Sequence, residues 1–388
     1  MTYTRETAVH VVGSRSTIPA GTASGSVLGD VTDEHVRRIV RLHLDPDGGS
    51  PYWIERDRRL GTDALRRVQG WADAVRLLSF RDDADQMHFE EASRRAPVES
   101  FVPRSVRDGG GFLWTAQTGG TTGTFKHGTW GADYWADVLD FSDEFLDLHG
   151  VPKGRNWLFV GPTGPHTTGR LVVAIAERRG GLCFCLDLDP TIVKIFGAEG
   201  MTAAADRYVR HIWDQARAVL VSQRIGVLFC TSRLLEMMPE YVELSLLSGV
   251  RAVLHAGTSM PPDSQRVLTE QIFPGVPVVG MYGTSTTGIC YQKPLEPEDE
   301  HRVVYVPSRP HVVLDIEDGP GSPVPYGAEG QVRVWRLTDD ALLPGFAERD
   351  RGRRVRPYGA VAERYPWPWI GDPYSPDFTE GRQPEGVY

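Results

Sequence analysis

The chain contains very little lysine. Of its 388 residues only Lys126, Lys153, Lys194 and Lys293 are lysine, although lysine and arginine together number 42. The net charge is −9 and no basic patch stands out, which argues against nucleic acid and anionic membrane as partners. No apolar run approaches a membrane span, and the amino terminus lacks a signal-peptide pattern. We therefore expect a cytoplasmic protein.

Cysteine is also scarce, with four residues in the chain. Cys183 and Cys185 form a C-x-C pattern within an apolar run, next to Cys230 and Cys290 farther along. A C-x-C pair on one strand face could bind a metal, but two small core residues are the favoured interpretation. Free, buried thiols agree with a reducing compartment.

Composition indicates an ordinary globular protein, because 40% of the residues are hydrophobic and 24% are charged. A chain of this length can hold two or three subdomains around a large core. Residues 1–110 are expected to form the helical amino-terminal part of that core. Residues 111–300 alternate short apolar runs with helical segments, which predicts an α/β core of parallel strands. Residues 301–388 are expected to form a small β-rich, antiparallel subdomain and a tail that wraps the surface.

Hydrophobic spacing predicts the individual elements. The expected helices are 33–44, 63–79, 85–96, 131–149, 169–179, 203–223 and 262–273. The expected strands are 111–116, 156–160, 181–186, 225–230, 252–255, 276–281, 303–306, 312–316 and 331–337.

Residues 117–126, with the sequence QTGGTTGTFK, are the most informative segment. Seven of these ten residues are Gly or Thr, and the segment follows a predicted strand and ends at Lys126. Such a loop exposes backbone N–H groups and hydroxyls, which is how proteins hold phosphate. A P-loop is excluded, because no glycine of the segment begins the G-x-x-x-x-G-K-[ST] pattern, and the G-x-G-x-x-G pattern is also absent.

Two further strand exits follow in the α/β region. Residues 253–262 read VLHAGTSMPP, and residues 278–288 read VVGMYGTSTTG. Both place a loop at the carboxyl end of a predicted parallel strand, where open α/β sheets bind ligands. A later turn, GAEGQVRV at 327–334, leads into a strand.

Together these motifs resemble the adenylate-forming superfamily, and within it the phenylacetate–CoA ligase branch. The order is the same: the phosphate loop, then A-G-T-x-x-P, then Y-G-T-S, then G-x-x-G-Q-V, over about residues 100–350. The stretch FVGPTGPH at 159–166 is similar to the glycine/histidine stretch of that branch. The resemblance implies the α/β fold of the amino-terminal domain of these enzymes, with layered subdomains and a small β-rich subdomain. It also implies ATP-dependent activation of a carboxylic acid as an acyl-adenylate.

The resemblance further implies roles for particular residues. The triphosphate would be covered by Thr118, Gly119, Gly120, Thr121, Thr122, Gly123 and Lys126. The adenine would be lined by Ala256, Gly257 and Thr258, with Tyr282 against its face. Gly283 and Thr284 would let the backbone approach the α-phosphate, and His166 would sit near the acyl carboxylate. Asp350 is the candidate for the ribose, with Glu348 as runner-up, although a solvated charge cluster is nearly as good an interpretation.

Three departures from the family pattern bear on the activity. Thr286 stands where relatives carry a Mg²⁺-binding glutamate, so we expect no protein metal ligand there and Mg²⁺ held through the phosphates. The ribose motif is only loosely matched around Asp350. No lysine follows Lys293, so we expect that the carboxy-terminal lid domain and its lysine are absent, as in truncated members of the phenazine-antibiotic type.

The leading hypothesis is an ATP-dependent ligase for an aromatic carboxylic acid in specialised or antibiotic metabolism. The acid would be an aminohydroxybenzoate such as 3-hydroxyanthranilate, or a phenazine carboxylate. The acyl group would pass to a small-molecule hydroxyl or amine, or to a partner enzyme. The alternatives are an aryl–CoA ligase that needs a partner in place of its lid, and a non-catalytic protein that binds a nucleotide or an acyl-adenylate. A homodimer is possible. Trp213, Phe229 and Met281 are candidates for the acid pocket, although Trp213 and Phe229 read better as core.

Overall fold

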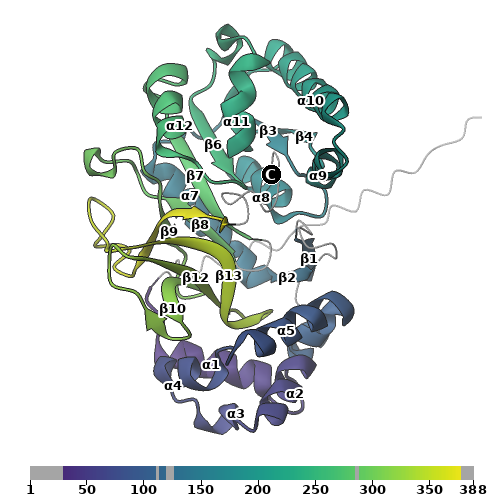
Figure 1. Cartoon of the computed structure of the whole chain (residues 1–388), viewed down its shortest axis with the longest axis vertical. Coiled ribbons are helices and arrows are strands. Elements are labelled where there is room, and N and C mark those ends of the chain that lie inside the picture. The colour runs from purple at the N-terminus through teal and green to yellow at the C-terminus, as the bar shows by residue number, and fades with distance from the viewer. Residues whose placement is uncertain (1–28, 111–112, 119–125, 285–287, 377–388) are drawn as a thin grey trace, which may run out of the picture.

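The computed structural model describes residues 29–110, 113–118, 126–284 and 288–376 (Figure 1). The centre of the predicted phosphate loop, Gly119 to Phe125, lies outside the described residues, and so does Thr286. Within the described ranges, no helix is both long enough and apolar enough to cross a membrane.

Helices α1 to α5 of the amino-terminal part lie at one end of the molecule in Figure 1. They are α1 (Asp33–Leu44), α2 (Pro51–Leu60), α3 (Ala64–Arg67), α4 (Trp71–Leu78) and α5 (Asp83–Arg95). The helix predicted over 63–79 is wrong in one respect, because it is split at Gly70. The Trp71 backbone N–H donates to Asp33 Oδ1 over 2.9 Å, and a side chain at position 70 would collide with the same carboxylate. The break therefore depends on a contact with a distant residue, which spacing cannot show.

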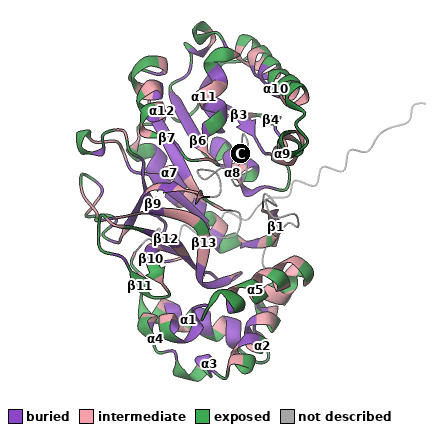
Figure 2. Cartoon of the chain, viewed as in Figure 1, coloured by how far each residue is buried: buried purple, intermediate pink, exposed green. Residues whose placement is uncertain are grey.

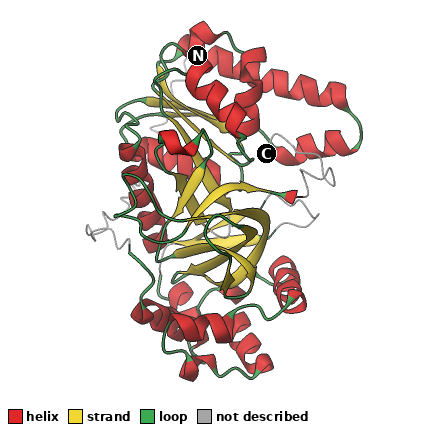
Figure 3. Cartoon of the chain, turned by 60° about the vertical axis from the view of Figure 1, so that its left-hand side comes forward, coloured by secondary structure: helices red, strands yellow, loops and turns green. Residues whose placement is uncertain are grey.

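Five of the twelve strands described in the large sheet are parallel neighbours, with helices on the faces of the sheet (Figures 1 and 3). The order is β4-β3-β5-β6-β7, and every neighbouring pair is parallel. The strands are β3 (Asn156–Gly161), β4 (Cys183–Asp187), β5 (Ile225–Thr231), β6 (Ala252–Ala256) and β7 (Val278–Thr284). The helices are α7 (Ala132–Leu148), α8 (Thr167–Arg178), α9 (Pro190–Ala198), α10 (Thr202–Ser222), α11 (Ser232–Met237) and α12 (Pro262–Val267). The predicted parallel α/β core is confirmed.

The sheet continues beyond β7 with antiparallel strands. In the described residues the full order is β11-β10-β12-β13-β14-β9-β8-β7-β6-β5-β3-β4. The added strands are β8 (Gly288–Gln292), β9 (Val304–Pro307), β10 (Val312–Gly319), β11 (Ser322–Pro323), β12 (Glu329–Leu337), β13 (Leu342–Val355) and β14 (Trp369–Tyr374). The antiparallel pairing predicted after residue 301 is confirmed, and these strands share one sheet with the parallel ones. The strand direction changes between β7 and β8, beside Tyr282.

Buried residues concentrate in the sheet and on the helix faces that cover it (Figure 2). Trp213, Phe229 and Met281 belong to this core, with 1%, 1% and 6% of their surfaces exposed. The interpretation of Trp213 and Phe229 as core is confirmed. Cys230 and Cys290 are fully buried, as expected, but Cys185 is exposed and Cys183 is only half-buried. The expectation that the C-x-C pair belongs to the core is therefore wrong, because its strand β4 forms the edge of the sheet.

A separate two-stranded hairpin carries the predicted phosphate loop. Its strands are β1 (Leu113–Gln117) and β2 (His127–Gly131). Trp114 stacks on Trp130 at 5.3 Å between ring centroids, and Trp130 stacks on Tyr134 at 5.1 Å. The Arg336 guanidinium lies 5.0 Å from the Trp130 ring centroid and 4.6 Å from that of Tyr134. This stack fixes the hairpin against β12 and α7.

Arg336 is expected to be a main determinant of stability. Its side chain is 1% exposed, and it donates to Asp340 Oδ2 at 2.6 Å and to the Thr129 carbonyl at 2.8 Å. Arg336→Ala leaves the buried Asp340 carboxylate without this ion pair, which should lower the free energy of unfolding by about 3–5 kcal/mol. Urea denaturation followed by tryptophan fluorescence measures the change.

Arg217→Ala is the matched control, because Arg217 pairs with Glu243 at the surface and is 42% exposed. Its loss should cost no more than about 1 kcal/mol. Equal losses for the two variants would contradict the role assigned to Arg336.

Candidate functional site

The carboxyl ends of the parallel strands meet at one edge of the sheet. Strand β3 ends at Gly161 before the loop that leads to His166, β5 ends at Thr231, β6 ends at Ala256, and β7 ends at Thr284. Because these strands are parallel neighbours, their following loops are brought side by side. The motifs that follow β3, β6 and β7 thus lie at the same edge, although more than a hundred residues separate the first from the last.

Two hydrogen bonds close the base of the predicted phosphate loop. The Thr118 backbone N–H donates to the Lys126 carbonyl at 2.9 Å, and the Lys126 N–H donates to Thr118 Oγ1 at 3.1 Å. A third bond, from the Gln117 N–H to the Pro165 carbonyl at 2.8 Å, ties the hairpin to the loop after β3. The hairpin is therefore attached to the strand-end edge of the sheet. Gly119 to Gly123, predicted to contact phosphate, lie outside the described residues.

His166 lies at the junction between that loop and α8. It is 7% exposed, its backbone is extended, and helix α8 begins at the next residue. The loop is held from the other side by Asp187 at the end of β4. Asp187 Oδ1 accepts from the Thr163 N–H at 2.8 Å and from Thr163 Oγ1 at 2.6 Å. These bonds hold the loop that leads to the buried His166.

Lys126 points from the hairpin toward α5 and β13. Its Nζ lies 3.7 Å from Glu90 Oε1 and 5.2 Å from the centroid of the Phe346 ring. The side chains of this ion pair are 24% and 21% exposed, so solvent reaches both partners. A partly solvated pair of this length is weak. Lys126 can therefore exchange Glu90 for a stronger anionic partner such as a phosphate.

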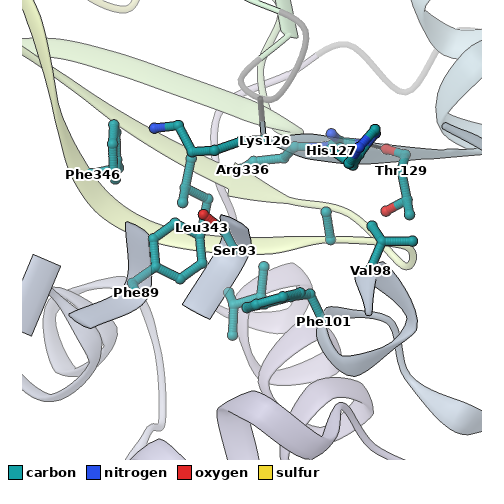
Figure 4. A pocket seen from close by; sticks show the side chains of 13 residues that line it. Phe89, Ser93, Val98, Phe101, Lys126, His127, Thr129, Arg336, Leu343 and Phe346 are labelled. Carbon is teal, nitrogen blue, oxygen red and sulfur yellow. Dashed lines mark hydrogen bonds between the residues drawn. The ribbon is translucent and has the colours of Figure 1, made fainter. Parts of the chain in front are cut away.

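An apolar cavity lies next to Lys126, between α5 and the strands β2 and β13 (Figure 4). It contains about 610 Å³ of empty space, part of which is open to solvent. Its wall includes Phe89, Phe101, Leu343 and Phe346, and Figure 4 shows the Lys126 side chain beside Phe346. Such a lining does not suit a triphosphate, so we place any phosphate on the loop side of the hairpin.

The turn after β6 is fixed by α11. Gly257 has a φ of 92°, a left-handed conformation that favours glycine. Thr258 is held through both of its oxygens: its carbonyl accepts from Ser232 Oγ at 2.9 Å, and its Oγ1 accepts from the Arg233 N–H at 3.2 Å. Ser232 Oγ also lies 2.9 Å from Nδ1 of the buried His255, whose pKa burial lowers to about 3. The imidazole thus stays neutral and serves as scaffold.

Tyr282 and Gly283 mark the end of β7. A side chain at Gly283 would collide with the Gly288 carbonyl on the neighbouring strand, so glycine is required for the close approach of β7 and β8. The Tyr282 hydroxyl donates to Asp350 Oδ2 at 2.9 Å, and its ring lies 5.6 Å from the ring of Tyr305. Burial and the nearby carboxylates Asp350 and Glu348 raise the pKa of Tyr282, which keeps the hydroxyl protonated as a donor.

Asp350 and Glu348 lie two residues apart on β13. The pairing of β13 with β12 is irregular in this stretch, and the two carboxylates lie close enough for the charge of Asp350 to act on Glu348. Burial raises the pKa of Asp350, while the Tyr282 hydrogen bond opposes that effect. Burial, assisted by the charge of Asp350, raises the pKa of Glu348 to about 7, and Lys126 acts in the opposite direction. The sequence match at Asp350 was loose, yet the structure places this residue against Tyr282. An exposed charge cluster is therefore the wrong interpretation.

Several residues that hold the site were missed from sequence. Glu90 lies on a helix more than thirty residues before Lys126, and Asp187 and Ser232 each follow or end a strand as isolated polar residues. Asp187 and Ser232 could have been identified as candidate site residues, since each stands at the carboxyl end of a strand that spacing predicted. Glu90 could not have been identified, because nothing in the local sequence distinguishes it from the other acidic residues of α5.

Comparison with known proteins agrees with this geometry. Residues 195–337 match the AMP-binding enzyme family. An L-proline--[L-prolyl-carrier protein] ligase of Streptomyces coelicolor (strain ATCC BAA-471 / A3(2) / M145) is 29% identical over 175 residues. That alignment covers 44% of this chain and 25% of the relative, so the chain spans about a quarter of the length of this relative.

Solved structures show the same fold. An open conformation of a 2-hydroxyisobutyryl-CoA ligase, in complex with 2-HIB-AMP and CoA, has a TM-score of 0.61 at 12% identity. The match covers 87% of this chain and 72% of that one. The same ligase in its postadenylation state gives a TM-score of 0.58 at 11% identity, over 88% of this chain and 65% of that chain. The chain therefore shares the fold of these ligases, and residues 195–337 carry the AMP-binding family match.

The raised pKa of Glu348 predicts a pH dependence of stability. A carboxyl whose pKa rises from 4.5 to about 7 on folding binds more protons when folded. Its contribution to stability is present at low pH and is lost as the pH rises through about 7. Glu348→Gln removes this dependence. Between about pH 5 and about pH 8, the wild type should lose free energy of unfolding relative to the variant, as measured by urea denaturation.

Glu329→Gln serves as the control, since Glu329 lies exposed on the neighbouring strand β12. The difference between this variant and the wild type should stay constant over the same pH range. A constant difference for Glu348→Gln as well would refute the assigned environment.

Proposed function

We propose that this chain activates a carboxylic acid with ATP, forming an acyl-adenylate and releasing pyrophosphate. The observation that carries the proposal is the hydrogen bond between Tyr282 and Asp350 at the strand-end edge of the sheet. It joins the aromatic residue expected at the adenine to the carboxylate expected at the ribose, from two strands that are distant in sequence. The phosphate hairpin and His166 are tied to the same edge.

The proposed chemistry needs no protein nucleophile. An oxygen of the acid's carboxylate attacks the α-phosphorus, the bond from that phosphorus to the bridging oxygen breaks, and pyrophosphate leaves. The chain's part is to hold the reactants and neutralise charge. Lys126 exchanges Glu90 for the phosphates, Tyr282 supports the adenine, and Asp350 accepts from the ribose hydroxyls. His166 faces the carboxylate of the acid.

Mg²⁺ fits this scheme as an ion held mainly by the nucleotide. Among the described residues, no group of three His, Cys, Asp or Glu side chains is arranged to hold a metal ion. Mg²⁺ commonly binds through substrate phosphates and water with few protein ligands, and it would supply charge neutralisation there.

The finer proposal concerns the acid and the acceptor. We infer an aromatic acid, such as 3-hydroxyanthranilate or a phenazine carboxylate, from specialised metabolism, because the motif order resembles the phenylacetate–CoA ligase branch. The acyl group would pass to a small-molecule hydroxyl or amine, or to a partner enzyme. Thiol acceptors are the alternative, since the relatives include a carrier-protein ligase and a ligase with CoA bound. Product analysis with and without CoA separates these possibilities.

One observation favours a second candidate, a nucleotide-binding protein without catalysis. Lys126 is paired with Glu90 and directed toward Phe346. If that arrangement persists with ATP bound, the triphosphate lacks its lysine. Protein that binds ATP but exchanges no pyrophosphate with any acid, at any Mg²⁺ concentration, would establish this second candidate.

Lys126→Ala tests the leading proposal. ATP–pyrophosphate exchange, measured with the acid that gives the highest rate for the wild type, should fall about 10²–10³-fold, because a charge that stabilises the transferring phosphate is lost. Lys126→Arg should recover only part of the rate, since the guanidinium differs in shape and hydration.

Lys153→Ala is the matched control, because Lys153 lies on the surface, 53% exposed, and pairs with Asp143 and Asp147. Its exchange rate should equal that of the wild type. If Lys126→Ala also exchanges at the wild-type rate, the role assigned to Lys126 is wrong.

A further inference from the structure

The apolar cavity beside Lys126 has no part in the proposed adenylation. Helix α5, the short helix η1 (Val98–Phe101) and the strands β2 and β13 contribute to its wall (Figure 4). Of the residues that line it, only Lys126 has a role in the proposed chemistry. Its empty space of about 610 Å³, part of which is open to solvent, lies in the size range of small-molecule sites. The cavity is therefore a candidate for a second ligand.

Three aromatic rings of the wall meet edge to face. The Phe89 ring centroid lies 6.1 Å from that of Phe346 and 5.8 Å from that of Phe101, with interplanar angles of 69° and 88°. Val98 and Leu343 add aliphatic surface beside these rings. Because aromatic rings favour edge-to-face and offset neighbours, a further flat ring in the cavity would extend this cluster. The wall thus favours an aromatic ligand.

Several polar side chains of the wall already have partners within the protein. Ser93 Oγ donates to the Glu90 carbonyl at 2.8 Å, and Thr129 Oγ1 donates to the Asp340 carbonyl at 3.0 Å. Arg336 donates to Asp340 Oδ2 at 2.6 Å. Buried polar groups that are hydrogen-bonded in this way resist a change of partner. These three side chains therefore serve the fold.

Lys126 is a cation of the wall that can change partners. Its Nζ lies 3.7 Å from Glu90 Oε1 and 5.2 Å from the centroid of the Phe346 ring. Glu90 keeps a second partner when Lys126 leaves, because its Oε2 accepts from Arg94 Nη2 at 2.8 Å. A ligand carboxylate can therefore replace Glu90 on Lys126 without leaving the Glu90 charge unpaired.

We propose that this cavity binds a small aromatic monocarboxylate, with its ring among Phe89, Phe101 and Phe346 and its carboxylate on Lys126. The bound acid holds the Lys126 ammonium, so this acid and the triphosphate of ATP compete for one cation. That competition rests on the proposed function, because it needs Lys126 at the triphosphate, whereas binding of the acid does not. The cavity is thus an inhibitory site, separate from the strand ends where the acid substrate is expected.

Calorimetric titration without nucleotide tests the binding. The probes are 2-naphthoate and the neutral amide 2-naphthamide, which has the same rings and no charge. The wild type should bind 2-naphthoate at least about tenfold more tightly than the amide, because a hydrogen bond between charged groups is made only by the acid. Lys126→Ala should bind the two probes equally. Equal affinity of the wild type for the two probes would overturn the proposal, and so would absence of binding.

Val98→Phe locates the ligand, because the larger side chain fills part of the cavity from its half-buried position on η1. Its affinity for 2-naphthoate should fall at least about tenfold, since overlap with the ligand's ring cannot be relieved in a packed wall. Val221→Phe is the matched control, because Val221 is 70% exposed on α10, and it should bind as the wild type does. Circular dichroism establishes that both variants are folded.

Equal affinity of the two folded variants would place the ligand elsewhere and overturn the proposal. A crystal structure of the wild type with 2-naphthoate gives a second readout that needs no variant. Ligand density among the three phenylalanine rings supports the proposal, and density outside the cavity overturns it.

ATP–pyrophosphate exchange tests the competition. With the acid substrate that gives the highest rate, 2-naphthoate should raise the KM for ATP in the wild type and in Val221→Phe, and leave it unchanged in Val98→Phe. An unchanged KM in the wild type at saturating 2-naphthoate would contradict the inhibitory role. Loss of exchange in folded Val98→Phe would also contradict it, because the cavity would then hold the substrate. If no acid supports exchange, the proposed function fails, and the titrations still decide whether the cavity binds the acid.

Discussion

The contact between the last parallel strand and the antiparallel half of the sheet is the constraint on which the candidate site depends. Strand β7 ends at the point where the sheet changes direction, and there the Tyr282 hydroxyl donates to Asp350 on β13. Burial holds Tyr282 protonated as the donor, so the bond has a fixed direction. Gly283 is needed for the strand approach that allows it. If this junction opened, the parallel strand ends and the acidic side chains of β13 would no longer face one site.

The hairpin is the second component of the site, and it is held independently. Stacked Trp114, Trp130 and Tyr134, with Arg336 against them, fix its base. Among the described residues, Lys126 at its end makes a weak ion pair with Glu90 and lies over the Phe346 ring. A rigid base with one weakly paired cation is what a phosphate site needs, because the cation must change partners when the anion arrives.

Much of the fold was predictable from the sequence. The apolar runs that became β3, β5 and β6 are continuous and buried on both faces, a pattern typical of parallel strands. Helix α1 was predicted with its observed ends, because Thr32 caps it and two acids follow. The split of the helix over 63–79 was not predictable, since it depends on Asp33 approaching Gly70 in space. The exposure of Cys185 was missed for a similar reason: hydrophobic spacing shows that β4 is a strand, but strand order decides that it lies at the edge.

Some residues of the candidate site could likewise be predicted from the sequence, and others could not. Residues in contiguous motifs at strand ends, such as Gly257 and Tyr282, could be found because a turn or a close approach demands a particular residue type. Asp350 was proposed on a loose match, and only the register of the folded sheet places it beside Tyr282. Glu90 could not be found at all, because its partner Lys126 belongs to an element that folds against α5 from elsewhere in the chain.

Calorimetric titration of AMP into the wild type, Asp350→Asn and the surface control Asp147→Asn tests the central claim most directly. The account predicts that the wild type and Asp147→Asn bind AMP equally well. Asp350→Asn should bind at least about tenfold more weakly, because a charged acceptor for the ribose hydroxyls is lost. Circular dichroism establishes that each variant is folded. Equal affinity of folded Asp350→Asn and wild type would contradict the placement of the nucleotide at the junction of β7 and β13.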